Sequence, residues 1–169
     1  VRRQRQMCIR DSYDETKNVV TENNTAKTTI DSKTSTTNQV TTTVEGPKKT
    51  VSDADETNVT NNTVRSLADD WTYSITQKIA KNANEKYTSF AFKDSIEQCM
   101  KINSVKVKAD NGKDVTSWFD VSTVGNEVKA TLKNPGSNDE FYKNNSYTME
   151  INVKMDVPEL SLIHISEPT

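Results

Sequence analysis

The lysine at position 49 and the aspartate at position 94 are the residues of this sequence best placed to do chemistry. Each lies in a short segment in which polar and apolar residues alternate. Lys49 shares strand parity with Val51, and Asp94 shares it with Phe90 and Phe92, so both are expected to face an apolar interior. A lysine amine is a nucleophile only when neutral, and burial favours that form. A buried carboxylic acid stays protonated and can polarise a carbonyl group.

Both residues also have a purely structural interpretation. Lys49 can be a solvated lysine on a strand, and Asp94 can cap a turn that begins at Ser95. Lys48 directly precedes Lys49 and has the opposite parity. The sequence therefore leaves open which of the two lysines accompanies the acid.

The two ends of the sequence look foreign to the protein. Residues 160–169 (LSLIHISEPT) and the arginine-rich start match in-frame translations of the two transposase adapters used in sequencing libraries. We therefore expect residues 1–12 and 160–169 to be adapter artefacts, and we exclude them from the fold. The only histidine, His164, and one of the two cysteines, Cys8, fall in these ends.

The remaining composition excludes several classes of function. With no histidine and a single cysteine, Cys99, an internal disulfide, a structural zinc site and histidine acid–base catalysis are not expected. The formal net charge of the whole sequence is −2, and the end segments are net positive, which leaves an acidic chain without a nucleic-acid footprint. No apolar stretch could span a bilayer. We expect no cofactor, no metal and no enzymatic turnover.

Alternating segments predict β-strands over residues 71–79, 87–94, 102–109, 127–133 and 146–155. Asp110-Asn111-Gly112 and Asn134-Pro135-Gly136 are turn signals between them, and residues 95–100 are predicted to form a helical turn. Strands at this spacing indicate an all-β, antiparallel immunoglobulin-like β-sandwich. The expected core residues are Trp71, Tyr73, Ile75, Phe90, Phe92, Val105, Val107, Tyr147, Met149, Ile151 and Val153.

The residues before position 46 differ from the rest in composition. Residues 13–45 are rich in Thr and Asn, which suits weak strands at the C-terminal end of a preceding repeat, with a disordered linker as the alternative. Glu45-Gly46-Pro47 predicts a domain boundary. Residues 46–159 are expected to form the sandwich domain.

The order of these segments resembles the fimbrial isopeptide-forming domain, which recurs in tandem in Gram-positive surface adhesins and pilins. Lys49-Thr50-Val51 fills the place of the family's first strand. Trp71 to Ile75 fills the place of its aromatic Thr-Tyr strand, and Phe92 to Ile96 that of the strand ending in an acid. The resemblance implies an amide bond between a lysine and an asparagine side chain, with Lys49 as the amine and Asp94 as the assisting acid.

The family's asparagine is harder to place. In the family it lies in the last strand within an Asn-x-Ala pattern, and no such pattern follows Lys49. We therefore expect the sandwich to be truncated before its last strand. Asn24-Thr25-Ala26 fits the pattern near the start, so Asn24 is the candidate asparagine of a preceding repeat. The alternative is an ordinary asparagine in a Thr-rich strand.

The resemblance implies a structural stalk module of a cell-surface adhesin or pilin, anchored to the cell wall in the full-length protein. Its partners would be neighbouring repeats of the same polypeptide, with no nucleic acid and no membrane insertion. The alternative is an adhesin module that binds a glycan or host matrix. Trp71, Trp118 and Phe119 would then form a sugar-stacking platform, although large aromatic residues are more often core.

Overall fold

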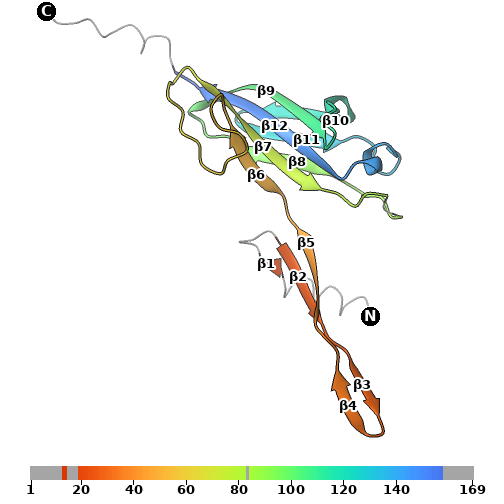
Figure 1. Ribbon diagram of the computed structural model, residues 1–169. Helices are drawn as coiled ribbons and strands as arrows, with labels where there is room; N and C mark the ends of the chain where they lie inside the picture. Colours follow the sequence, from red (N-terminus) through yellow and green to blue (C-terminus); the bar gives the residue numbers. More distant parts are fainter. Residues whose placement is uncertain (1–12, 15–18, 83, 158–169) are drawn as a thin grey trace, which may run out of the picture. The chain divides into compact units, whose positions relative to one another are not determined.

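The computed structural model describes residues 13–14, 19–82 and 84–157 (Figure 1). The chain divides into two compact units, residues 1–47 and residues 48–169. The predicted adapter segments, residues 1–12 and 160–169, lie outside the described residues. The described elements are strands and two short 3-10 helices.

The first unit is a ribbon of short antiparallel strands. A sheet of order β1-β2-β5 consists of β1 (Tyr13–Asp14), β2 (Val19–Asn24) and β5 (Val40–Glu45), and β3 (Lys27–Ile30) pairs with β4 (Lys33–Thr36) in a hairpin. Every side chain from residue 23 to residue 43 is exposed. The Thr-rich segment therefore forms strands, but over these residues it has no apolar core.

The second unit is an antiparallel β-sandwich, as predicted. One sheet has the order β6-β7-β12-β9 and consists of β6 (Lys48–Ser52), β7 (Asp70–Lys78), β12 (Ser146–Met155) and β9 (Met100–Ala109). The other has the order β10-β11-β8, from β10 (Phe119–Val124), β11 (Glu127–Leu132) and β8 (Ala91–Ser95). The 3-10 helices are η1 (Thr116–Trp118) and η2 (Phe141–Lys143).

The core follows from the alternation along β12, the central strand that pairs with both β7 and β9. Tyr147, Met149, Ile151 and Val153 point inward and are fully buried. The facing sheet contributes five buried side chains, and the ring centroids of Phe119 and Tyr147 lie 6.3 Å apart across the interior. Burying each large apolar side chain contributes roughly 1.5–3 kcal/mol, so this layer stabilises the sandwich.

Three of the eleven predicted core residues are only half-buried: Tyr73, Phe90 and Val105. Tyr73 lies between Ile151 on β12 and Val51 on the edge strand β6, beyond which the sheet ends. Phe90 precedes the edge strand β8, which has a neighbouring strand on one side only. Val105 is on the edge strand β9, close to a register shift in its pairing with β12. The other eight are buried, as predicted.

No helix forms over residues 95–100, where a helical turn was predicted, and the range contains a single hydrogen-bonded turn from the N–H of Met100 to the carbonyl of Glu97 at 3.0 Å. Strand β8 continues through Ser95, and the chain then turns before β9 begins at Met100. The N–H of Ile96 donates to the carbonyl of Asn126 at 2.8 Å, and the Ile96 side chain is buried. Burial of the Ile96 side chain keeps the first part of this segment extended, and the loss of alternation gives no sign of that burial.

Candidate functional site

Lys49 and Asp94 meet at facing edges of the two sheets. The Nζ atom of Lys49 lies 2.6 Å from Oδ2 of Asp94. Strand β6, which carries the lysine, is an edge of the four-stranded sheet, and β8, which carries the aspartate, is an edge of the three-stranded sheet. The pair therefore bridges the sandwich along one of its sides.

Strand register explains why both side chains point inward. Lys49 lies opposite Ile75 on β7, and Asp94 lies opposite Val128 on β11. Ile75 and Val128 are both buried, and residues opposite one another share a face of the sheet. Lys48 has the other parity and pairs with Thr76, whose hydroxyl bonds Thr148 on the outer face. Of the two lysines, the structure thus brings Lys49 to the acid.

The pair has two further contacts. The Nζ atom of Lys49 lies 4.6 Å from the centroid of the Tyr73 ring, within the range of a cation–π interaction. The other carboxyl oxygen of Asp94 accepts a 3.0 Å hydrogen bond from the N–H of Ser95. This bond to the next residue is not the turn cap considered for Asp94, because Ser95 still belongs to strand β8. Tyr73 was predicted only as core, since its parity gives no sign of its contact with the amine.

The expectation that both members lie in a dry interior is wrong for the lysine. Its side chain is 45% exposed, whereas the Asp94 side chain is 16% exposed. Lys49 stays accessible because β6 is an edge strand, and no strand of the described part of the chain covers the pair. An exposed amine of this kind is well solvated, so the pair lacks the dry surroundings that the sequence predicted.

The side of the sandwich that holds the pair is open. The N–H and carbonyl of Val51 bond Val59, outside the sheet, so the main-chain groups of Lys49, two residues away, point outward as well. Farther along this side lies a pocket of about 350 Å³. Its lining residues are Gln77, Lys78, Tyr87, Ser89, Phe90 and Ala91. Phe90 is half-exposed there although its ring contacts Phe92 and Phe141, each at 5.2 Å.

Asn24, the third residue predicted for the site, lies in the first unit. It ends β2 opposite Val40 and is exposed. Among the described residues, no asparagine side chain is hydrogen-bonded to Lys49 or Asp94. The structure therefore brings together two of the three predicted site residues.

The aromatic residues considered as a sugar platform belong to the core instead. Trp71 and Phe119 are buried, with 6% and 3% of their surface exposed. Trp118 is half-buried and packs against Tyr147 at a centroid distance of 6.5 Å. The three rings do not form an exposed surface on which a sugar could stack.

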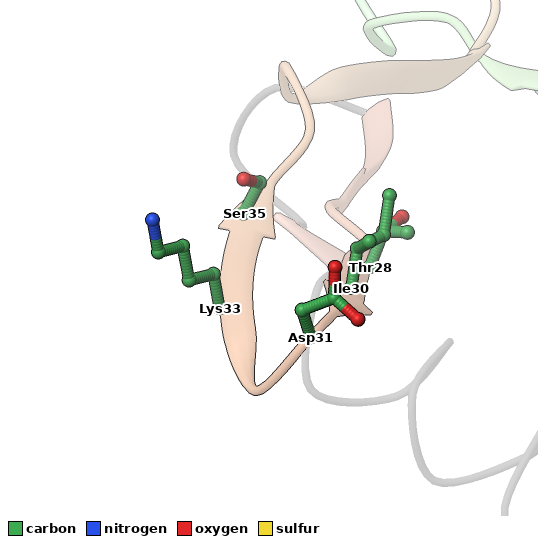
Figure 2. A pocket seen from close by; sticks show the side chains of 5 residues that line it. All are labelled: Thr28, Ile30, Asp31, Lys33 and Ser35. Atoms are coloured by element: carbon green, nitrogen blue, oxygen red, sulfur yellow. The ribbon is translucent and has the colours of Figure 1, made fainter.

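A second pocket, of about 270 Å³, lies on the β3–β4 hairpin (Figure 2). It is lined by Thr28, Ile30, Asp31, Lys33 and Ser35, all of them exposed. Figure 2 shows the Lys33 side chain extending away from Ile30 and Asp31. These groups do not converge on a common point, so the pocket suggests no particular ligand.

The described residues contain no group of three or more His, Cys, Asp or Glu side chains arranged to hold a metal ion. No helix in the same ranges is long and apolar enough to cross a membrane.

Residues 47–161 match the family model of the cell surface antigen I/II C2 terminal domain. The chain belongs to this family. The match covers β6 to β12, so Lys49 and Asp94 both lie inside this antigen I/II C2 domain. Membership in a family of cell-surface antigens confirms the predicted relation to surface adhesins and places the protein at the cell surface.

Solved structures support the fold of the C2 domain. The chain is similar to BcpA, the major pilin subunit of Bacillus cereus, with 18% identity and a TM-score of 0.53, over 80% of this chain and 39% of that one. A variant of the same pilin gives 17% identity and a TM-score of 0.50, over 81% of this chain and 39% of the other. The chain thus spans about two fifths of the length of these pilins. No curated protein matches the sequence significantly.

Proposed function

We propose that this antigen I/II C2 domain is a structural module in the shaft of a cell-wall-anchored adhesin or pilus, stabilised by a covalent bond between Lys49 and an asparagine. The observation that carries the proposal is the 2.6 Å contact between the Lys49 amine and the Asp94 carboxyl, made between two sheets on the open side of the sandwich. Neighbouring modules of the same polypeptide are its partners.

The open side supports the presence of a closing strand. Strands β6 and β8 each have a neighbour on one side only, and the half-exposed Phe90 extends the apolar surface between them. A strand laid along this side would hydrogen-bond the outward main-chain groups of Lys49. It would also exclude water from the pair, as bond formation requires. Asn24 is the corresponding asparagine of the preceding module.

The chemistry follows from drying the pair. Water stabilises separated charges, so covering Lys49 and Asp94 favours transfer of a proton from the amine to the carboxylate along their hydrogen bond. The neutral amine then attacks the carboxamide carbon of the asparagine. A bond forms between Nζ and that carbon, and the bond to the amide nitrogen breaks. Asp94 gives its proton to the leaving ammonia and regains one from the lysine nitrogen.

Intact-mass measurement on a domain carrying its closing strand tests the proposal. The expected mass is lower than the sequence mass by one ammonia, about 17 Da, because the new amide replaces an amine and a carboxamide. Lys49→Ala and Asp94→Ala should both restore the full mass. Lys48→Ala is the matched control, since it removes a neighbouring exposed lysine of the opposite parity, and it should leave the deficit unchanged.

The intact mass of the present chain complements the measurement on a domain that carries its closing strand. We expect the mass of this chain to show no ammonia deficit, because none of the strands β6 to β12 lies along the open side next to Lys49 and Asp94. A deficit that disappears in Asn24→Ala would show that β2 closes the sheet instead. Full mass in a domain that carries its closing strand would refute the covalent part of the proposal and leave the shaft role.

A further inference from the structure

Strand β10 presents a second unpaired edge, at the other side of the three-stranded sheet from β8 (Figure 1). It pairs with β11 over all six of its residues, and no other strand of the described chain pairs with it. Every residue from Asp120 to Val124 is exposed. Val121 is 37% exposed although its partner on β11, Ala130, is fully buried. The inward face of the sheet thus loses its cover at β10.

The hydrogen bonds of β11 show which main-chain groups are free. The N–H of Leu132 donates toward β8, to the carbonyl of Phe90, and the N–H of Lys133 donates to the carbonyl of Trp118. The residue of β10 that faces Leu132 therefore directs its N–H and carbonyl groups away from β11, and so does every second residue that follows it along β10. These residues are Phe119, Val121 and Thr123, of which Phe119 already donates its N–H to the carbonyl of Thr116.

Two other edges of the sandwich are protected. Strand β9 carries Lys101, Lys106 and Lys108 and has a register shift in its pairing, two features that discourage pairing with another chain. Strand β6 has part of its edge occupied by Val59. Strand β10 has no lysine and no proline, and its register with β11 is unbroken. Its only charged residue is Asp120.

We infer that β10 is a self-association edge, which pairs antiparallel with β10 of a second copy of this chain about a twofold axis at Val121. In that register Val121 meets its own counterpart on the inward face, where each covers the other. Asp120 lies opposite Ser122 of the second copy on the outer face, so no like charges face one another. The two three-stranded sheets become one sheet of six strands.

The charge on β10 selects this register over its neighbour. A shift that puts Phe119 opposite Val121 would also place Asp120 opposite Asp120 of the second copy, which is unfavourable. The contact is small, because stable interfaces bury about 1,200–2,000 Å² and five residues of one strand bury less. Association is therefore weak in dilute solution and increases where many copies are attached to one surface, which raises their effective concentration.

Sedimentation of the full chain over a range from about 10 μM to 1 mM tests the inference. The expected result is a weight-average mass that rises with concentration toward the dimer. Val121→Lys should abolish the rise, because it adds a charge to the edge on a side chain that is already part-exposed. Leu67→Lys, which makes the same change at a 60% exposed loop position, is the matched control and should leave the rise intact.

Cross-linking tests the register. In a background in which Cys8 and Cys99 are replaced by serine, Val121→Cys should form a covalent dimer under mild copper oxidation, each pair of thiols losing two electrons and two protons to the oxidant. Paired Cα atoms at about 5.5 Å fall within the range of a disulfide. Thr123→Cys should not cross-link, since the two cysteines would be four residues, about 13 Å, apart.

A chain that remains monomeric at the highest concentration, with no Val121→Cys dimer, would overturn the inference. Equal cross-linking of Thr123→Cys, or a rise in mass that Val121→Lys leaves unchanged, would overturn it as well.

Discussion

The phenol of Tyr147 donates a 2.7 Å hydrogen bond to the carbonyl of Phe141, and the two rings stack with centroids 4.4 Å apart. The Asn144 side chain donates to the same hydroxyl at 2.8 Å. Strand β12 thereby fastens the short helix η2, which precedes it, onto the centre of the core. Burial raises the pKa of Tyr147 to about 12, from its usual value of 10.

Tyr147→Phe should therefore destabilise the domain by about 1–2 kcal/mol, since it keeps the ring but removes the 2.7 Å bond to the Phe141 carbonyl, which retains only the 3.5 Å bond from the N–H of Asn144. The difference from the native chain should be constant below pH 10. It should narrow between pH 10 and about 12, because an unfolded tyrosine ionises there while the folded one resists. Urea titrations at several pH values measure this difference. A difference that stays constant up to pH 12 would contradict the raised pKa.

Gly125 provides a test of backbone conformation. It lies in the turn between β10 and β11 with φ +58°, and an added Cβ would meet no atom within 4 Å. Gly125→Ala should destabilise the domain by about 1 kcal/mol through the unfavourable φ alone. Gly136 is equally open but does not have a positive φ, so Gly136→Ala should be nearly neutral. Thermal unfolding of the two variants gives the comparison, and equal melting temperatures would count against the argument.

Asp110 joins the turn after β9 to the start of β12. Its carboxylate accepts two bonds from Asn145, at 3.0 Å from the backbone N–H and 2.8 Å from the side chain. These bonds lower the pKa of Asp110 below 3.8. The stability that these two bonds contribute should be fully present above about pH 4 and should be lost as the pH falls through the lowered pKa of Asp110. The free energy of unfolding of the native chain should therefore exceed that of Asp110→Asn by less and less as the pH falls, which acid-unfolding curves measure. A difference that grows as the pH falls would contradict the lowered pKa of Asp110.

Val128 and Val124 offer a matched pair for the core. Val128 is fully buried on β11, whereas Val124 is 76% exposed at the end of β10. Val128→Ala should destabilise the sandwich by roughly 2–3 kcal/mol, because it removes buried methyl groups and leaves a cavity. Val124→Ala should change stability by less than about 0.5 kcal/mol. Similar losses in the two variants would mean that the end of β10 is covered in solution.

The sequence predicted the central strands well because alternation reports directly which face a residue occupies. On β12 every second residue from Tyr147 to Val153 is buried, as the pattern requires. The same parity argument, together with the family resemblance, led to Lys49 and Asp94. The exposure of Lys49 could not be predicted in this way, because parity gives the face of a strand but not whether the strand is an edge.

Other features depended on contacts between distant segments. The extended course of Ile96 depends on Asn126, thirty residues later, and on burial that local pattern does not encode. The half-exposure of Phe90 likewise depends on which strands lie beside β8. The contact of the lysine amine with Tyr73 requires β6 and β7 to pair in one particular register. Each is a tertiary property, which a single sequence gives only through a known relative.

The strand directions in the four-stranded sheet have a mechanical consequence. Strands β6 and β12 lie on either side of β7 and are both antiparallel to it, so they run parallel to each other. Tension applied at Lys48 and Met155 would pull the two strands in opposite directions along their own axes. The hydrogen bonds to β7 would then be loaded together in shear and not broken one after another as in a zipper. The hydrogen-bond ladder between β6 and β7 is shorter than the one between β7 and β12. A covalent bond at Lys49, one residue from the loaded end at Lys48, would carry the tension in place of this shorter ladder.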